Sequence, residues 1–234
     1  MEESGTCQTQ RISGKMPVYE EFCREREADM QSIRKSSEAE IVLEFLKMEW
    51  TSVRFEKQLR ASMETIGVGE ELLFCADLSD IHENSLRRRL LGDFRGYGQN
   101  RALFENFPLN LSWTLMRFDA EDLARLRYIR YDYWDVLSGG TGRPLDAAEN
   151  IRRGMTVFDV PNDGFQAAAQ ALDRGVRFPP LIALCASAAP SDIFLVEGHL
   201  RATAYALRPK AFPGTLCYIG ACPKAEIDHW RGGV

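Results

Sequence analysis

The stretch FLVEGHLRATAY, residues 194–205, combines residue types that bind phosphate. An apolar run ending at Val196 is followed by an acidic residue, a glycine and a histidine, and Arg201 comes two residues later. The run before Glu197 is typical of a buried strand, and residues 199–207 are typical of a helix. Because the first amides of a helix lack intrahelical partners and carry the positive end of its dipole, this pattern predicts an anion site.

Each residue of the turn has a matching chemical role. Gly198 removes the side chain where a phosphate would approach the backbone, and the amides of His199 and Leu200 could donate to it. Arg201 can place two donors on phosphate oxygens, and the His199 ring can add another. Glu197 can hold Mg²⁺ or act as a base, so Glu197 and His199 are candidate catalytic residues. The alternative is a surface turn whose charges are incidental.

A second group of candidates lies in RYDYWDVLSGGTGR, residues 130–143. Its aromatic residues could stack on a purine ring, and Asp132 or Asp135 could be a base or a metal ligand. Ser138 and Gly140 belong to a glycine-rich loop that could bend around phosphates, although no G-K-[ST] follows as in a Walker A loop. The alternative is an aromatic packing segment that ends in a flexible loop.

Around the turn, the chain resembles the ParB/sulfiredoxin-like superfamily. The resemblance rests on PPLIAL, the apolar strand after it and EGHLRATAY, and it covers roughly residues 140–222. Members share a glycine and an arginine at a strand-to-helix turn that binds nucleotide phosphates, which implies this role for Gly198 and Arg201. GTGRPLDAAENIRRG resembles the first box of ParB-like domains, which implies that Arg143 faces the nucleotide. Thr203, on the helix after the turn, is a further candidate for contact with the ligand.

The residues at which this turn differs from the family's motifs exclude some of the family's functions. Sulfiredoxins carry G-C-H-R, and His199 stands in the place of their catalytic cysteine, so we do not expect sulfinic-acid repair. ParB partition proteins carry G-E-R-R and a helix-turn-helix segment further on, whereas this sequence ends at Val234. The turn of the free-serine kinases in the superfamily is D-G-H-x-R, which residues 197–201 match with glutamate in place of aspartate. The resemblance therefore implies phosphoryl transfer from ATP or another NTP, with Mg²⁺, to a small hydroxyl compound, or else hydrolysis of the NTP.

The elements around these residues predict an α/β or α+β fold with a mostly helical N-terminal region. Residues 1–17 are expected to form a mobile polar arm, followed by a helical region over 18–125. Within it, helical spacing of apolar residues over 18–66 predicts one helix, or two with a break near 35–37. The order helix, strand, strand, helix, strand predicts a ParB/sulfiredoxin-like, nucleotide-binding core over 126–234.

Composition limits the class of protein. The 234 residues are 45% hydrophobic and 27% charged, as in globular proteins with a substantial core. No run approaches the ~18 apolar residues of a membrane span, and the N-terminus lacks the order of a secretory signal, so we expect a cytoplasmic protein without a membrane partner. The six cysteines have no zinc spacing, and only Cys217 and Cys222 could meet across a turn.

Two other functions stay open at this point. The net charge of −5 argues against general affinity for nucleic acid, but arginines gathered over residues 87–101 could contact its phosphates. The protein would then be a module that binds nucleic acid or a partner, with the nucleotide as a switch. The other alternative is an interaction protein with a degenerate nucleotide site. Assembly into a homo-oligomer is compatible with each of these functions.

Overall fold

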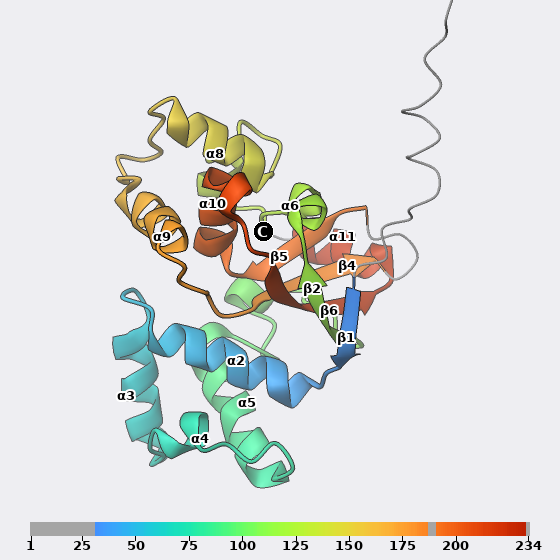
Figure 1. Ribbon diagram of the computed structural model, residues 1–234. Coiled ribbons are helices and arrows are strands. Elements are labelled where there is room, and N and C mark those ends of the chain that lie inside the picture. The colour runs from blue at the N-terminus through green and yellow to red at the C-terminus, as the bar shows by residue number, and fades with distance from the viewer. Residues whose placement is uncertain (1–30, 187–190, 233–234) are drawn as a thin grey trace, which may run out of the picture.

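The computed structural model describes residues 31–186 and 191–232. In this part of the chain, ten helices, α2–α11, surround a six-stranded mixed sheet, which confirms the expected α/β class (Figure 1). The expected polar arm over 1–17 and the helix expected over 18–30 lie outside the described residues. No described helix combines the length and the apolar character that a membrane crossing requires.

The sheet has the strand order β1-β2-β6-β4-β5-β3. Strands β4 and β6 are parallel, as are β3 and β5, and the other neighbours are antiparallel. The strands are β1 (Gln31–Lys35), β2 (Ser112–Phe118), β3 (Leu126–Arg127), β4 (Leu181–Ala186), β5 (Ile193–Glu197) and β6 (Thr215–Cys222). The helices before β2 are α2 (Glu38–Trp50), α3 (Glu56–Ile66), α4 (Glu71–Phe74) and α5 (Ile81–Arg95). The helices after it are α6 (Ala120–Arg125), α7 (Asp132–Leu137), α8 (Pro144–Arg152), α9 (Asp163–Asp173), α10 (His199–Leu207) and α11 (Lys224–Gly232).

Different parts of the chain cover the two faces of the sheet. Helices α8, α9 and α10 lie together on one side in Figure 1, and α2 to α5 lie on the other. Side chains alternate between these layers, as strands require: Ala183 and Leu195 belong to the core beneath α10, whereas Ile182 and Val196 pack with α2 and α5. The N-terminal helices therefore pack directly on the sheet that contains the predicted turn.

Local signals explain where several helices after residue 119 begin. Asp119 accepts hydrogen bonds from two amides of α6 and forms a capping box with Asp122. Pro144 is the first residue of α8, where its fixed φ and missing N–H do no harm. Helix α10 spans His199–Leu207, as predicted.

Residues 31–35 form a strand, and the prediction of a helix there was wrong. All five residues of β1 are exposed, so its position depends on pairing with β2 and not on an apolar pattern of its own. The N–H of Ser36 continues this pairing by donating to the carbonyl of Trp113 at 2.9 Å. Backbone pairing across more than 75 residues of sequence therefore overrides the local helical preference.

Helix α5 is capped by Asp80, whose carboxylate accepts from the amides of His82 and Glu83 at 2.7 and 3.1 Å. Aspartate is among the best residues at this position. The cysteines Cys75, Cys185, Cys217 and Cys222 are free thiols.

Candidate functional site

The predicted strand-to-helix turn lies between β5 and α10. Gly198 adopts φ +105°, in the left-handed region. A Cβ on this residue would lie 2.4 Å from Cδ2 of Leu181, so both the backbone conformation and the packing require glycine. No side chain caps the N-terminus of α10, and Leu200 in its first turn is 44% exposed. The first amides of α10 are thus open to a ligand.

Arg201 is built into the fold at this turn. Its side chain is 10% exposed, and Nη1 donates to the carbonyl of Pro179 at 3.2 Å. Its Nη2 donates to Sδ of Met48 on α2 at 2.7 Å and lies 3.4 Å from Oε1 of Glu197. Burial lowers the pKa of Arg201, and Glu197 opposes that effect. These three bonds use three of the five N–H groups of the guanidinium and leave two for a ligand.

A second carboxylate approaches the turn from the N-terminal region. Glu49 on α2 is 3% exposed, and its Oε1 lies 3.2 Å from Nε of Arg95, at the end of α5. Neither atom makes an aligned hydrogen bond in the described part of the chain. Burial raises the pKa of Glu49 to about 7; Arg95 opposes the rise, and the nearby charge of Glu197 adds to it. Glu49, Arg95, Glu197 and Arg201 are called the turn cluster below.

The ring of His199 packs against aromatic residues. It stacks on Trp134 at 5.1 Å and on Tyr128 at 5.8 Å between ring centroids. Its Nε2 accepts a hydrogen bond from the N–H of Ile129 at 3.4 Å. Burial, with the positive charges of Arg201 and Arg95, lowers the pKa of His199 to about 3. The imidazole is therefore neutral near pH 7, and its clearest role is to join the turn to the aromatic segment.

Two other candidate hydroxyl groups are buried and bonded within the protein. Thr203 donates to the carbonyl of His199 at 2.7 Å, and its Oγ1 lies 2.6 Å from the hydroxyl of Tyr128. Ser138 donates to the carbonyl of Trp134 at 2.7 Å and accepts from the N–H of Gly142 at 2.9 Å. These bonds fix α10 and the glycine loop in place.

The remaining candidates lie on the surface of the aromatic segment and its loop. Asp132 begins α7, Arg143 precedes α8, and both are exposed. Gly140 lines a different cavity, beside Arg127. Trp134 joins this segment to the turn by stacking on His199. The structure thus brings together Glu197, Gly198, His199, Leu200 and Arg201.

Sequence reasoning missed Glu49 and Arg95. The signal for Glu49 was nevertheless present, because Val42, Phe45 and Glu49 occur at i, i+3 and i+7, and all three are buried on one face of α2. An ionisable residue in an apolar stripe is a candidate for function. Arg95 had no comparable local signal, since its contact with Glu49 spans two helices.

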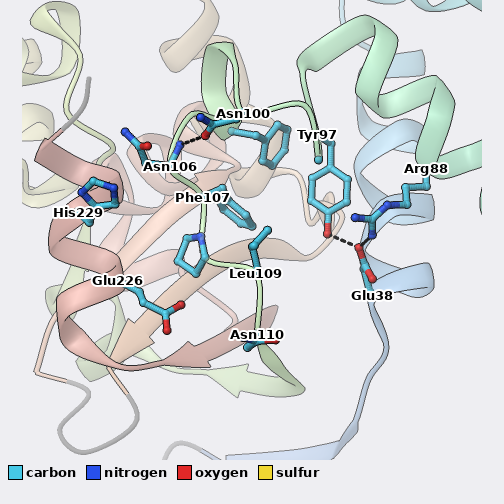
Figure 2. Close-up of a pocket in the computed structure, with 13 residues that line it drawn as sticks. Glu38, Arg88, Tyr97, Asn100, Asn106, Phe107, Leu109, Asn110, Glu226 and His229 are labelled. Carbon is cyan, nitrogen blue, oxygen red and sulfur yellow. Dashed lines mark hydrogen bonds and ion pairs between the residues drawn. The ribbon is translucent and has the colours of Figure 1, made fainter.

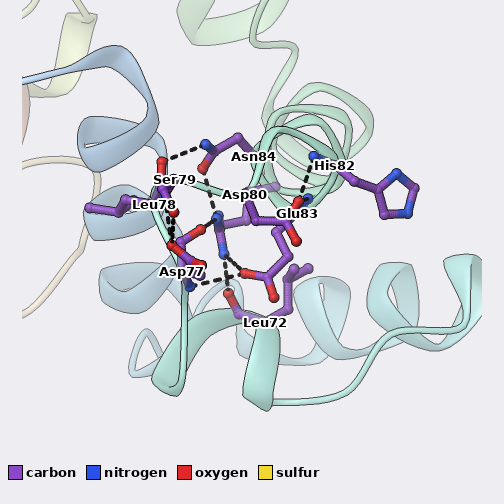
Figure 3. Close-up of polar contacts among 9 residues, drawn as sticks. Leu72, Asp77, Leu78, Ser79, Asp80, His82, Glu83 and Asn84 are labelled. Atoms are coloured by element: carbon purple, nitrogen blue, oxygen red, sulfur yellow. Dashed lines mark hydrogen bonds and ion pairs between the residues drawn. The ribbon is translucent and has the colours of Figure 1, made fainter.

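The arginines over residues 87–101 are bonded within the fold. The guanidinium of Arg87 is fully buried and donates to the carbonyls of Leu72 and Asp77 and to the side chains of Glu83 and Asn84, all at 2.7–2.9 Å. Figure 3 shows these acceptors converging from α4, the loop after it and the first turn of α5. Arg87 is therefore a structural residue.

The other arginines in this stretch have partners as well. Arg88 forms an ion pair with Glu38, which also accepts from the hydroxyl of Tyr97 (Figure 2). Arg101 donates to the carbonyls of Gly92 and Asp93 at 2.8 and 2.7 Å. The positive groups that are concentrated in this part of the sequence therefore pair with carboxylates or donate to carbonyls in the structure.

A cavity of about 530 Å³ lies beside this stretch and away from the turn. Figure 2 shows its wall, in which Leu109 and Phe107 lie between asparagines and two residues of α11, Glu226 and His229. None of the residues predicted for the nucleotide site lines it, whereas Arg88, one of the arginines considered for nucleic acid, does. Part of its polar wall is already paired, since Asn100 accepts from the N–H of Asn106 at 2.6 Å.

Comparisons with known proteins add no relative. No protein-family model matches the chain, and no curated protein or solved structure matches it either. Within the described residues, no group of three or more His, Cys, Asp or Glu side chains could hold a metal ion without other ligands.

Proposed function

We propose that this chain binds a nucleotide at the turn between β5 and α10 and transfers a phosphoryl group from ATP, or another NTP, to a small hydroxyl compound. The proposal includes the ParB/sulfiredoxin-like relationship and a cytoplasmic location. One observation supports it above the others: the uncapped N-terminus of α10 lies beside the turn cluster, where the buried atoms Oε1 of Glu49 and Nε of Arg95 form an ion pair at 3.2 Å but make no aligned hydrogen bond within the described residues. Buried polar atoms are nearly always hydrogen-bonded, so this gap favours a ligand.

The phosphates would bind the first amides of α10 and the free N–H groups of Arg201. No side chain caps these amides, and Leu200 in the first turn is exposed to solvent. Arg201 itself is held by Pro179 and Glu197, so its donors are oriented before the ligand arrives. Preorganised donors of this kind favour the charge that develops in phosphoryl transfer.

Magnesium would be held by phosphate oxygens and one or two carboxylates. Glu197 fits this requirement, because its carboxylate lies at the turn and is partly exposed. When bound, the metal neutralises phosphate charge and orients the transferred group. Glu49, with a pKa of about 7, is suited to accept the proton of a substrate hydroxyl. The acceptor compound would lie toward Asp132 and the loop over 138–142.

A charge placed at the mouth of the site tests binding. Leu200→Glu puts a carboxylate in the first turn of α10, where it suits the helix dipole but repels phosphate. Leu200→Gln is the matched control, because it loses the same apolar contacts without adding charge. Arg201→Ala is a poorer test, since the buried guanidinium also bonds to Met48 and Pro179.

Calorimetric titration with ATP, ADP, CTP and GTP, with and without Mg²⁺, gives the readout. We expect wild type and Leu200→Gln to bind at least one nucleotide, and Leu200→Glu to bind it at least 10-fold more weakly. Equal affinity in Leu200→Glu and Leu200→Gln, or no binding by wild type, would refute the site. Release of ADP that depends on an added small alcohol would establish transfer, provided that Glu49→Gln loses this release while it still binds the nucleotide. Binding of the nucleotide without release of ADP would favour the alternative in which the nucleotide acts as a switch.

A further inference from the structure

A cavity of about 410 Å³ lies at the β3 edge of the sheet. Arginines from two separate parts of the chain line it: Arg127 in β3 and Arg130 shortly after it, and Arg231 in α11. The glycine loop over 140–142 forms another part of the wall. This space is called the edge cavity below.

Two of these arginines have buried N–H groups without a partner. Nη1 of Arg127 and Nε of Arg231 are both buried and make no hydrogen bond in the described part of the chain. The rest of each side chain is fixed: Arg127 bonds to Asp192 at 2.8 Å, and the guanidinium of Arg231 lies 4.0 Å from the ring centroid of Phe194. Guanidinium groups that are held in place on the walls of one cavity favour an acceptor within it.

The charge of the lining favours an anion. Three guanidinium groups face the two carboxylates of Asp135 and Asp192, which leaves one positive charge in excess. Burial lowers the pKa of Arg231, and the neighbouring charge of Arg130 adds to this effect. Positive groups gathered so closely repel one another, and a bound anion would relieve that repulsion.

We propose that the edge cavity binds the phosphate group of a small phosphate monoester. A phosphate offers three terminal oxygens to donors that approach from different directions, whereas a carboxylate offers two in one plane and matches a single arginine. The volume is typical of a small-molecule site, and Tyr128 and Phe194 are among the residues that line it, so an organic group also fits. This inference does not depend on the nucleotide site at the turn cluster.

Calorimetric titration of the full chain with glycerol 3-phosphate, inorganic phosphate and acetate tests the inference. Arg130→Gln is the main variant, because Arg130 is exposed and its loss leaves the core intact; Arg231→Gln is the second. We expect wild type to bind the monoester at least as tightly as phosphate and more tightly than acetate. Each variant should bind the monoester at least 10-fold more weakly. Arg174→Gln, an equal loss of charge at the exposed end of α9, should bind like wild type.

Leu200→Glu separates this inference from the proposed function. If Leu200→Glu still binds the monoester and Arg130→Gln binds it more weakly, the monoester binds in the edge cavity. The inference is overturned if wild type does not bind the monoester, if Arg130→Gln and Arg231→Gln both bind it like wild type, or if acetate binds as tightly. Loss in Leu200→Glu alone would place the phosphate at the turn and also overturn it.

Discussion

Replacing Glu49 with glutamine should change how stability depends on pH. Burial raises the pKa of this carboxyl from 4.5 to about 7 in the folded protein, because the charged form loses solvation beside α5. In the unfolded chain the same carboxyl ionises from about pH 4.5. Between these values the unfolded state binds fewer protons, so the contribution of Glu49 to stability is complete below pH 4.5 and is lost as the pH rises through 7.

The size of this effect follows from the two pKa values. Each pKa unit corresponds to about 1.4 kcal/mol, so the difference between 4.5 and about 7 amounts to about 3 kcal/mol. Glutamine has nearly the same shape but does not ionise. We therefore expect the free energy of unfolding of Glu49→Gln, relative to wild type, to increase by about 3 kcal/mol between pH 4 and pH 8.

Urea denaturation followed by circular dichroism at pH 4, 6 and 8 measures this difference. Glu105→Gln, at an exposed position, is the matched control for the loss of one carboxyl group. If the free energies of unfolding of wild type and Glu49→Gln change with pH in the same way across this range, the carboxyl of Glu49 is not buried in the way that raises its pKa. Its suitability as a base at neutral pH would then also be lost.

Four further substitutions, one of them a control, test other parts of the fold by urea denaturation. Gly198→Ala should lower the free energy of unfolding by about 2–4 kcal/mol, because both the left-handed backbone and the contact with Leu181 disfavour a Cβ. Arg87→Met should lower the free energy of unfolding by about 3–5 kcal/mol, because it leaves buried acceptors unpaired. Arg88→Met, the control at an exposed ion pair, should lower it by less than about 1 kcal/mol. His199→Gln should remove a loss of stability that wild type shows as the pH falls from 6.5 toward 3.

Features with a local cause could be predicted from the sequence. The turn at Gly198 and the helix after it follow from an apolar run, a glycine and a helical pattern within 15 residues, and the structure has them at the expected positions. The cap at Asp119 and the start of α8 at Pro144 are local in the same sense. The class of fold follows because such elements alternate along the C-terminal half.

Features that depend on distant partners could not be predicted. Strand β1 exists because β2 pairs with it, and nothing in residues 31–35 indicates that partner. Arg201 was expected to face a ligand, but the sequence did not show that Met48 on α2 takes one of its N–H groups. The pairing of Glu49 with Arg95 likewise arises only when α2 and α5 pack side by side. The site at the turn therefore contains residues from both halves of the chain.

The two unusual ionisable groups near the turn have opposite effects on stability. His199, with a pKa lowered to about 3, adds stability as the pH rises toward 6.5, whereas Glu49, with a pKa raised to about 7, removes it over part of the same range. The free energy of unfolding of wild type should therefore change less with pH between 4.5 and 6.5 than that of either variant. Stability should rise with pH in Glu49→Gln, where His199 remains, and fall in His199→Gln, where Glu49 remains. Slopes of the same sign in the two variants would contradict this account of the turn.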